Sequence, residues 1–263
     1  MRFIERFLIL LGLGASAAAT PLPAPAQSMS HATWDRLLQA HVRSGLVDYD
    51  AFARSAEFQQ YLNALAATNP SGMGRNDQLA YWINAYNAYT IQLINKHGER
   101  VSIRNINKTL GVVRAYGPWN EPIVRAGGRT YTLDHLEQQI LRKQIREPRI
   151  HFALVCAAMG CPPLRSEAYT GARMEEQLDD QARLFLARTP SKNRVDLANR
   201  TLYASQIFQF RDYEKDFGGT PRAIGRYIAR YLPDGPEKRL LESGDFRIRY
   251  TDYDWSLNKQ RAR

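Results

Sequence analysis

The two cysteines of the chain, Cys156 and Cys161, lie in its densest stretch of chemically useful residues, HFALVCAAMGCPPL at positions 151–164. An apolar run over residues 150–156 predicts a buried strand that ends at Cys156 and passes into a turn of small residues. Such a turn can present a thiolate beside backbone N–H groups that act as oxyanion donors, as nucleophilic catalysis requires. The same spacing also allows a Cys156–Cys161 disulfide across a four-residue loop.

A catalytic Cys156 would need a base and an orienting group. His151 is close in sequence, but side chains alternate along a strand, so the predicted strand puts the two residues on opposite faces, ~16 Å apart. His135, in the helix predicted before that strand, is the candidate base, and Asn84 or Asn87 on a central helix is the candidate orienter. The two amides also have a structural interpretation, in which they tie their helix to neighbouring backbone.

Composition and motifs argue against several other chemistries. The chain has 36 Lys and Arg against 26 Asp and Glu, a net charge of +10, but the arginines are spread along the whole sequence, so we expect no nucleic-acid partner. No HExxH, HxxxH or CxxC motif occurs, so we expect no metal and no other cofactor. Trp82, Tyr86 and Tyr89 follow helical spacing and are expected in the core.

The N-terminal residues have the pattern of a cleaved export signal. Arg2 and Arg6 precede a 13-residue apolar run over 7–19, and Ala-Pro-Ala at 24–26 offers a cleavage site before Gln27. The run is shorter than the about 20 apolar residues of a membrane-spanning helix, so we expect no stable membrane span once residues 1–26 are removed. The mature protein is expected to be periplasmic or secreted, where oxidising conditions allow a disulfide to persist.

Residues 30–263 are predicted to form a single α+β domain with helices packed around a small, mainly antiparallel sheet. The 78–97 helix is apolar almost all round and should be central. Hairpins are expected around 127–128 and 199–200, and short extended segments at 46–49 and 246–250. Further helices are predicted over 33–44, 55–68 and 172–187, from Pro221 onward, and from Thr132 or Asp134 to a point before Pro148.

Five segments of the sequence, taken in order, resemble one family: LVDYDAF at 46–52, YWINAYNA at 81–88, LDHLEQQILR at 133–142, PRIHFALVCAAMGCPPL at 148–164 and DYDWSLN at 252–258. Together they make nearly all of the mature chain similar to the domain of unknown function 547 (DUF547) family. The resemblance implies an exported or envelope protein and carries over no activity. This sequence has Gln138 where the family commonly has a histidine, and His135 lies one helical turn earlier. If that histidine is the base in active relatives, its absence counts against catalysis here.

Two hypotheses from different classes follow. The favoured one is a non-catalytic exported domain that binds an envelope protein or polymer, with Cys156 and Cys161 joined in a structural disulfide. The alternative is a thiol-dependent, papain-like hydrolase or acyl transferase, in which Cys156 is the nucleophile, His135 the base and Asn84 or Asn87 the orienter. A free and reactive Cys156 distinguishes the second hypothesis from the first.

Overall fold

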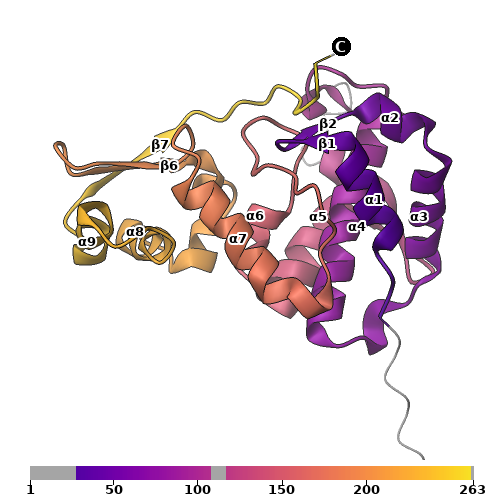
Figure 1. Ribbon diagram of the computed structural model, residues 1–263, viewed down its shortest axis with the longest axis horizontal. Helices are drawn as coiled ribbons and strands as arrows, with labels where there is room; N and C mark the ends of the chain where they lie inside the picture. Colours follow the sequence, from indigo (N-terminus) through magenta and orange to yellow (C-terminus); the bar gives the residue numbers. More distant parts are fainter. Residues whose placement is uncertain (1–27, 108–116, 262–263) are drawn as a thin grey trace, which may run out of the picture.

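A computed structural model describes residues 28–107 and 117–261, so the predicted export signal at 1–26 lies outside the described residues (Figure 1). The N-terminal third consists of helices α1 (Ala32–His41), α2 (Tyr49–Arg54) and α3 (Ala56–Ala67), which pack around the long helix α4 (Arg75–Lys96). Every residue of α4 from Leu79 to Ile94 is buried except Gln92. The prediction of a central helix is confirmed, and Trp82, Tyr86 and Tyr89 belong to its buried set.

Short polar side chains start several of the helices. Asp48 and Ser55 accept hydrogen bonds from backbone N–H groups in the first turns of α2 and α3, and Thr220 does the same for α8 (Pro221–Ala229). Thr132 caps α5 (Leu133–His135), so the start predicted at Thr132 or Asp134 falls on Thr132. The helix predicted up to residue 44 ends earlier, because β1 (Val42–Arg43) and β2 (Leu46–Val47) form a two-stranded hairpin there.

The middle of the chain contains a hairpin and an unusual helix. β3 (Pro122–Ala126) pairs antiparallel with β4 (Arg129–Thr132), as the Gly-Gly pair predicted. α5 then continues as η5 (Leu136–Ile145), which is a π-helix and not the α-helix that periodicity predicted. Arg146 ends it in the left-handed region, at φ +58°. Ten residues of π-helix are rare, and such segments are concentrated at functional sites.

The strand predicted over 150–156 is wrong. Residues Ile150–Ala153 form the single helical turn α6, and the chain is extended only from Leu154 onward, without a partner strand there among residues 28–107 and 117–261. A short apolar run has no reliable periodicity, so a buried helical turn and a buried strand cannot be told apart from it. The consequence is large, because the helical turn removes the strand alternation that was expected to separate His151 from Cys156.

The C-terminal third contains α7 (Met174–Ala187) after the short helix η6 (Gly171–Arg173), and a three-stranded sheet of β5 (Arg194–Asp196), β6 (Thr201–Ser205) and β7 (Arg247–Thr251). β5 and β6 form the predicted antiparallel hairpin, whereas β6 and β7 run parallel. The crossover between them holds η7 (Gln206–Gln209), η8 (Tyr213–Phe217), α8 and α9 (Pro236–Ser243). The α+β class is confirmed, with the described strands divided among three small sheets.

Two hydrophobic clusters make up the core. The larger is built on α1 to α6 and the smaller on α7, β6, η7, η8 and α8. The C-terminal tail runs from β7 back across the molecule to the β1–β2 hairpin, as the yellow segment in Figure 1 shows. There Val47 N–H donates to the Asn258 carbonyl (2.9 Å), and Met159 N–H donates to the Ser256 carbonyl (2.8 Å). In residues 28–107 and 117–261, no helix is both long and apolar enough to cross a membrane.

Candidate functional site

A pocket of about 270 Å³ lies where the two hydrophobic clusters meet. One side comes from α4, α5, η5, α6 and the start of the disulfide loop, which we define as residues 156–161. The other side comes from the η7–η8 segment and the C-terminal tail. Long-range packing therefore creates the pocket, and it holds both charged groups and aromatic rings.

Cys156 and Cys161 are joined by a disulfide, with their Cα atoms 6.2 Å apart. Cys156 is partly exposed and lines the pocket, whereas Cys161 is 5% exposed and lines a separate cavity. Ala157 follows in the left-handed region, at φ +60°, which is unfavourable for any residue with a side chain. The sequence allowed either a catalytic thiolate at Cys156 or a Cys156–Cys161 disulfide, and the geometry agrees with the disulfide.

The Tyr253 hydroxyl lies against both sulfurs of the disulfide, 3.0 Å from Cys156 Sγ and 3.2 Å from Cys161 Sγ. A Cβ atom at Gly160 would come within 2.6 Å of the Tyr253 ring, so only glycine allows this close approach. Burial, and after it the charge of Glu137, raises the pKa of Tyr253. The hydroxyl therefore stays protonated and available as a donor over the physiological range.

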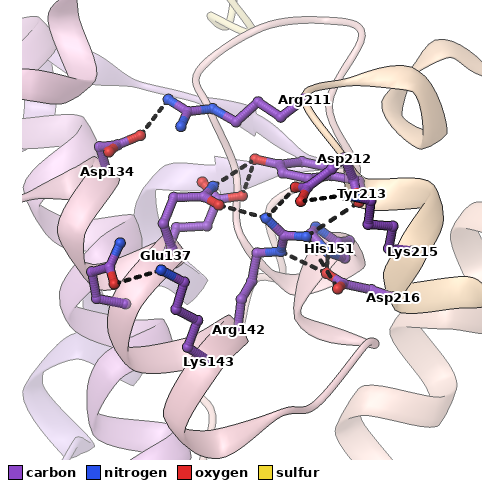
Figure 2. Close-up of polar contacts among 12 residues, drawn as sticks. Asp134, Glu137, Arg142, Lys143, His151, Arg211, Asp212, Tyr213, Lys215 and Asp216 are labelled. Atoms are coloured by element: carbon purple, nitrogen blue, oxygen red, sulfur yellow. Dashed lines mark hydrogen bonds and ion pairs between the residues drawn. The ribbon is translucent and has the colours of Figure 1, made fainter.

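His151 is completely buried, and its Nε2 lies 2.6 Å from Asp216 Oδ2 (Figure 2). Arg142 donates to the same carboxyl group from Nε at 2.6 Å and reaches Asp212 at 2.9 Å. Burial by itself would raise the pKa of Asp216, but the hydrogen bonds from His151 and Arg142 outweigh it and lower that pKa to about 2. The His151 ring also packs on Tyr213, with centroids 4.2 Å apart. Asp216 thus fixes the orientation of the imidazole at the edge of the pocket.

Glu137 is, with Asp134, one of two acidic residues that line the pocket. Its carboxylate accepts hydrogen bonds from the hydroxyls of Tyr213 and of Tyr86, the latter at 3.4 Å. Burial first, and the charge of Glu137 second, raises the pKa of both tyrosines, so both remain donors. Arg142 donates to Gln138 Oε1 and, as Figure 2 shows, to Asp212 and Asp216. Within the part of the chain that the structure describes, no lysine or arginine forms an ion pair with Glu137.

An ion pair and four aromatic rings complete the pocket. Asp134 of α5 pairs with Arg211 of the η7–η8 segment. The Trp255 ring lies 5.7 Å from that of Phe210 and 4.6 Å from that of Tyr253, and Trp119 packs edge-on against it at 6.1 Å. These rings form an apolar wall of the pocket, which the carboxyl groups of Asp134 and Glu137 also line.

The structure does not bring together the residues predicted for papain-like catalysis. His135 is exposed, packs on Tyr131 at 5.3 Å and does not line the pocket. Asn84 bonds the backbone of Tyr169 through both amide atoms, at 2.8 and 3.0 Å. Asn87 holds the Ala153 carbonyl (3.0 Å) and the Val155 N–H (2.9 Å) in the same way. The structural interpretation of both amides is therefore the one that the geometry supports.

Several residues of the site were missed by sequence reasoning. His151 was rejected because of the predicted strand, and Glu137, Tyr213, Asp216 and Tyr253 were not considered at all. Tyr253 and Trp255 lie in DYDWSLN, one of the segments that carry the family resemblance, so a signal existed there. Glu137 likewise lies in such a segment, whereas Tyr213 and Asp216 have no mark in the sequence beyond an aromatic and charged stretch at 208–217.

Comparison with known families gives one match. Residues 70–186 match the family model described as a protein of unknown function, DUF547. The matched region includes α4, η5, α6 and the disulfide loop, while Tyr213, Asp216, Tyr253 and Trp255 lie beyond it. No curated protein and no solved structure matches the chain.

Proposed function

Because residues 70–186 of this chain match a family model whose description, DUF547, assigns no activity, we propose a function from the pocket. The protein is an exported, non-catalytic binding domain that holds a primary amine carried by an envelope protein or polymer. The amine is the chemistry that both kinds of partner would share.

The observation that carries this proposal is the combination of Glu137 with the aromatic wall. The Glu137 carboxylate is partly exposed in the pocket, accepts hydrogen bonds from two tyrosine hydroxyls and has no basic partner among the described residues. The rings of Phe210, Tyr253 and Trp255 line the same pocket. An ammonium group is attracted by a carboxylate and by the faces of aromatic rings, and partial desolvation strengthens both interactions.

Two further observations support the non-catalytic and exported parts of the proposal. The sulfur of Cys156 is bonded to Cys161, so it is not a free thiolate nucleophile in this form. The basic and apolar pattern of residues 1–26 is typical of a signal for export to a compartment where a disulfide persists.

A pair of matched ligands tests the amine proposal. Nα-acetyl-lysine amide carries the ammonium group, and Nα-acetyl-norleucine amide has the same chain length without it. Binding is followed by fluorescence, because Trp119 and Trp255 line the pocket. We expect the lysine compound to bind at least about tenfold more tightly, which corresponds to ~1.4 kcal/mol.

Two variants complete this test. Glu137→Gln should abolish the preference for the lysine compound, and Glu57→Gln, at an exposed site on α3, should keep it. Equal binding of the two compounds to the wild type would contradict the proposal.

The alternative function, a thiol-dependent hydrolase or acyl transferase that uses Cys156, keeps one observation in its favour. His151 lines the same pocket as Cys156, and Asp216 orients its ring. This alternative requires the reduced protein, and it places the base at His151 and not at His135. Hydrolysis of a small thioester by reduced protein, lost in both Cys156→Ser and His151→Asn, would favour it over the binding domain.

A further inference from the structure

We propose that the Cys156–Cys161 disulfide is a thiol-exchange site: a small thiol bound in the pocket forms a mixed disulfide with Cys156 and releases Cys161 as a thiolate. The preference for the charge of that thiol rests on the proposed amine binding at Glu137. The exchange step itself rests only on the surroundings of the two sulfurs.

The two sulfurs are not equivalent, and the difference defines their roles. Cys161 Sγ accepts a hydrogen bond from the Cys156 backbone N–H at 3.0 Å, a donor that Cys156 Sγ does not share. The Tyr253 hydroxyl lies within reach of both sulfurs, 3.0 Å from Cys156 Sγ and 3.2 Å from Cys161 Sγ, and can donate to Cys161 once that sulfur carries the charge. Donors of this kind stabilise a thiolate more than a neutral sulfur, because hydrogen bonds to charged acceptors are stronger. Cys161 is therefore the better leaving group, and a lower-energy leaving thiolate speeds exchange.

The exposure of the two sulfurs to the pocket favours the same assignment of roles. Cys156 is partly exposed and lines the pocket, so a thiol in the pocket meets this sulfur. Cys161 is 5% exposed and does not line that pocket. The loop also carries stored strain next to the attacked residue, since Ala157 has φ +60°. Attack at Cys156 with departure of Cys161 is thus favoured by access and by leaving-group stabilisation together.

The chemistry is balanced without any further reagent. The incoming thiol loses its proton to water, and its thiolate attacks Cys156 Sγ. A new S–S bond forms to Cys156, the Cys156–Cys161 bond breaks, and its electron pair passes to Cys161 Sγ, which can then take a proton from water. A second thiol that attacks the mixed disulfide releases the small disulfide, so two substrate thiols are oxidised and the protein disulfide is reduced.

Glu137 determines which charge the pocket prefers on the incoming thiol, and Tyr253 supplies a hydrogen-bond donor to the sulfur. Burial and the Glu137 charge raise the pKa of Tyr253, so its hydroxyl remains a donor to sulfur while the thiol is bound. A thiol that carries a carboxylate would face repulsion from Glu137, and one that carries an ammonium group would be attracted. An aminothiol is therefore the substrate class that this pocket favours.

The test measures the rate at which the protein disulfide exchanges with cysteamine, with 2-mercaptoethanol and with 3-mercaptopropionate. Each rate is divided by the rate of the same thiol with an oxidised peptide of residues 155–162. This reference corrects for the intrinsic reactivity of each thiol. Samples are trapped with N-ethylmaleimide and mapped by mass spectrometry. We expect an adduct on Cys156 with the alkylating group on Cys161, and relative rates in the order cysteamine, 2-mercaptoethanol, 3-mercaptopropionate.

Variants separate the exchange step from the amine preference. Tyr253→Phe keeps the ring and removes one donor, and should slow exchange about tenfold for all three thiols. Gly160→Ala, which displaces the Tyr253 ring, should slow it similarly. Glu137→Gln should equalise the three thiols and leave exchange itself in place. A wild type that exchanges without the expected order would contradict the amine proposal and leave the exchange site standing. An adduct on Cys161, or exchange in the wild type no faster than in the peptide and in Tyr253→Phe, would overturn the exchange site.

Discussion

At the scale of single residues, Asp216 connects the stability of the site to pH. Burial alone would raise its pKa above the ordinary value of 3.8. The hydrogen bonds from His151 and Arg142 have the larger effect and lower the pKa to about 2. A carboxyl group with a lowered folded pKa stabilises the fold above its unfolded pKa and loses that contribution as pH falls. The loss should fall between pH ~4 and ~2. Because the side chain is 25% exposed, we expect only about 1–2 kcal/mol.

Urea unfolding at pH 5 and pH 2 measures this contribution. Asp216→Asn should lose about 1–2 kcal/mol less than the wild type between these two pH values. Asp252→Asn, at an exposed position in the tail, serves as the matched control and should follow the wild type. A wild-type pH dependence identical to that of Asp216→Asn would show that the His151 and Arg142 contacts do not hold the carboxylate.

Only some residues of the site could be predicted from the sequence. The cysteine pair and the buried central amides were recognisable from residue type and spacing, and the disulfide and the backbone clamps that they form were among the interpretations considered. The hydrogen bond between His151 and Asp216 was not predictable, because 65 residues separate the two and no local pattern marks such a contact. Long-range electrostatic pairs depend on the packing of whole elements.

At the scale of elements, Asn87 on α4 connects the central helix to the chain just before Cys156. Asn87→Ala leaves the Ala153 carbonyl and the Val155 N–H buried without partners, so we expect a loss of roughly 2–4 kcal/mol of unfolding free energy. Asn84→Ala removes an equivalent clamp on Tyr169 and should cost about as much. Chemical denaturation measures both.

The two asparagine variants should differ in the pocket. At a temperature where both are folded, Asn87→Ala should weaken binding of the lysine compound, because its clamp positions the chain that leads to Cys156. Asn84→Ala should bind as the wild type does, since it holds the segment at Tyr169. Equal effects on binding would mean that the Asn87 clamp stabilises the fold without positioning the site.

Helix α4 itself should be sensitive to loss of packing. Trp82 is 7% exposed, and its ring packs edge-on against Tyr81 and Tyr131 at 4.9 and 5.9 Å. Trp82→Ala is expected to cost about 3–5 kcal/mol through the cavity it leaves. Thermal unfolding followed by circular dichroism checks this. A variant that stays stable but no longer binds the ligand would instead indicate that Trp82, Tyr86 and Tyr89 form a recognition surface.

The elements also show where periodicity succeeds and where it fails. α4 was predicted because its buried stretch from Leu79 to Ile94 gives a long, largely apolar run in the sequence. α6 has only four residues, too few for any period, and η5 differs from an α-helix in its hydrogen-bond register, which the apolar pattern hardly registers. Those two elements carry His151 and Glu137, so the least predictable part of the fold is the part that builds the pocket.

At the scale of the whole molecule, the pocket depends on the C-terminal tail crossing from β7 to the N-terminal helices (Figure 1). The tail supplies Tyr253 and Trp255 to the pocket, and Asn258 anchors it by accepting a hydrogen bond from the Tyr49 hydroxyl at 2.5 Å. The segments LVDYDAF at 46–52 and DYDWSLN at 252–258 are therefore in contact, although both lie outside the residues 70–186 that match the family model.

Export and the disulfide together give the last prediction. If residues 1–26 direct export, the protein from its native host should begin near Gln27. When it is denatured without reduction and alkylated, it should show no free thiol. The same chain without residues 1–26, made in a reducing cytosol, should have both cysteines alkylated. It should also be less stable by about 2 kcal/mol, because a disulfide across so short a loop removes only a little conformational entropy from the unfolded chain. Cys161→Ser, exported in the same way, should show one free thiol, at Cys156. A wild-type product that starts at Met1 would contradict export, and a free, selectively labelled Cys156 in the exported protein would contradict the disulfide and favour the hydrolase.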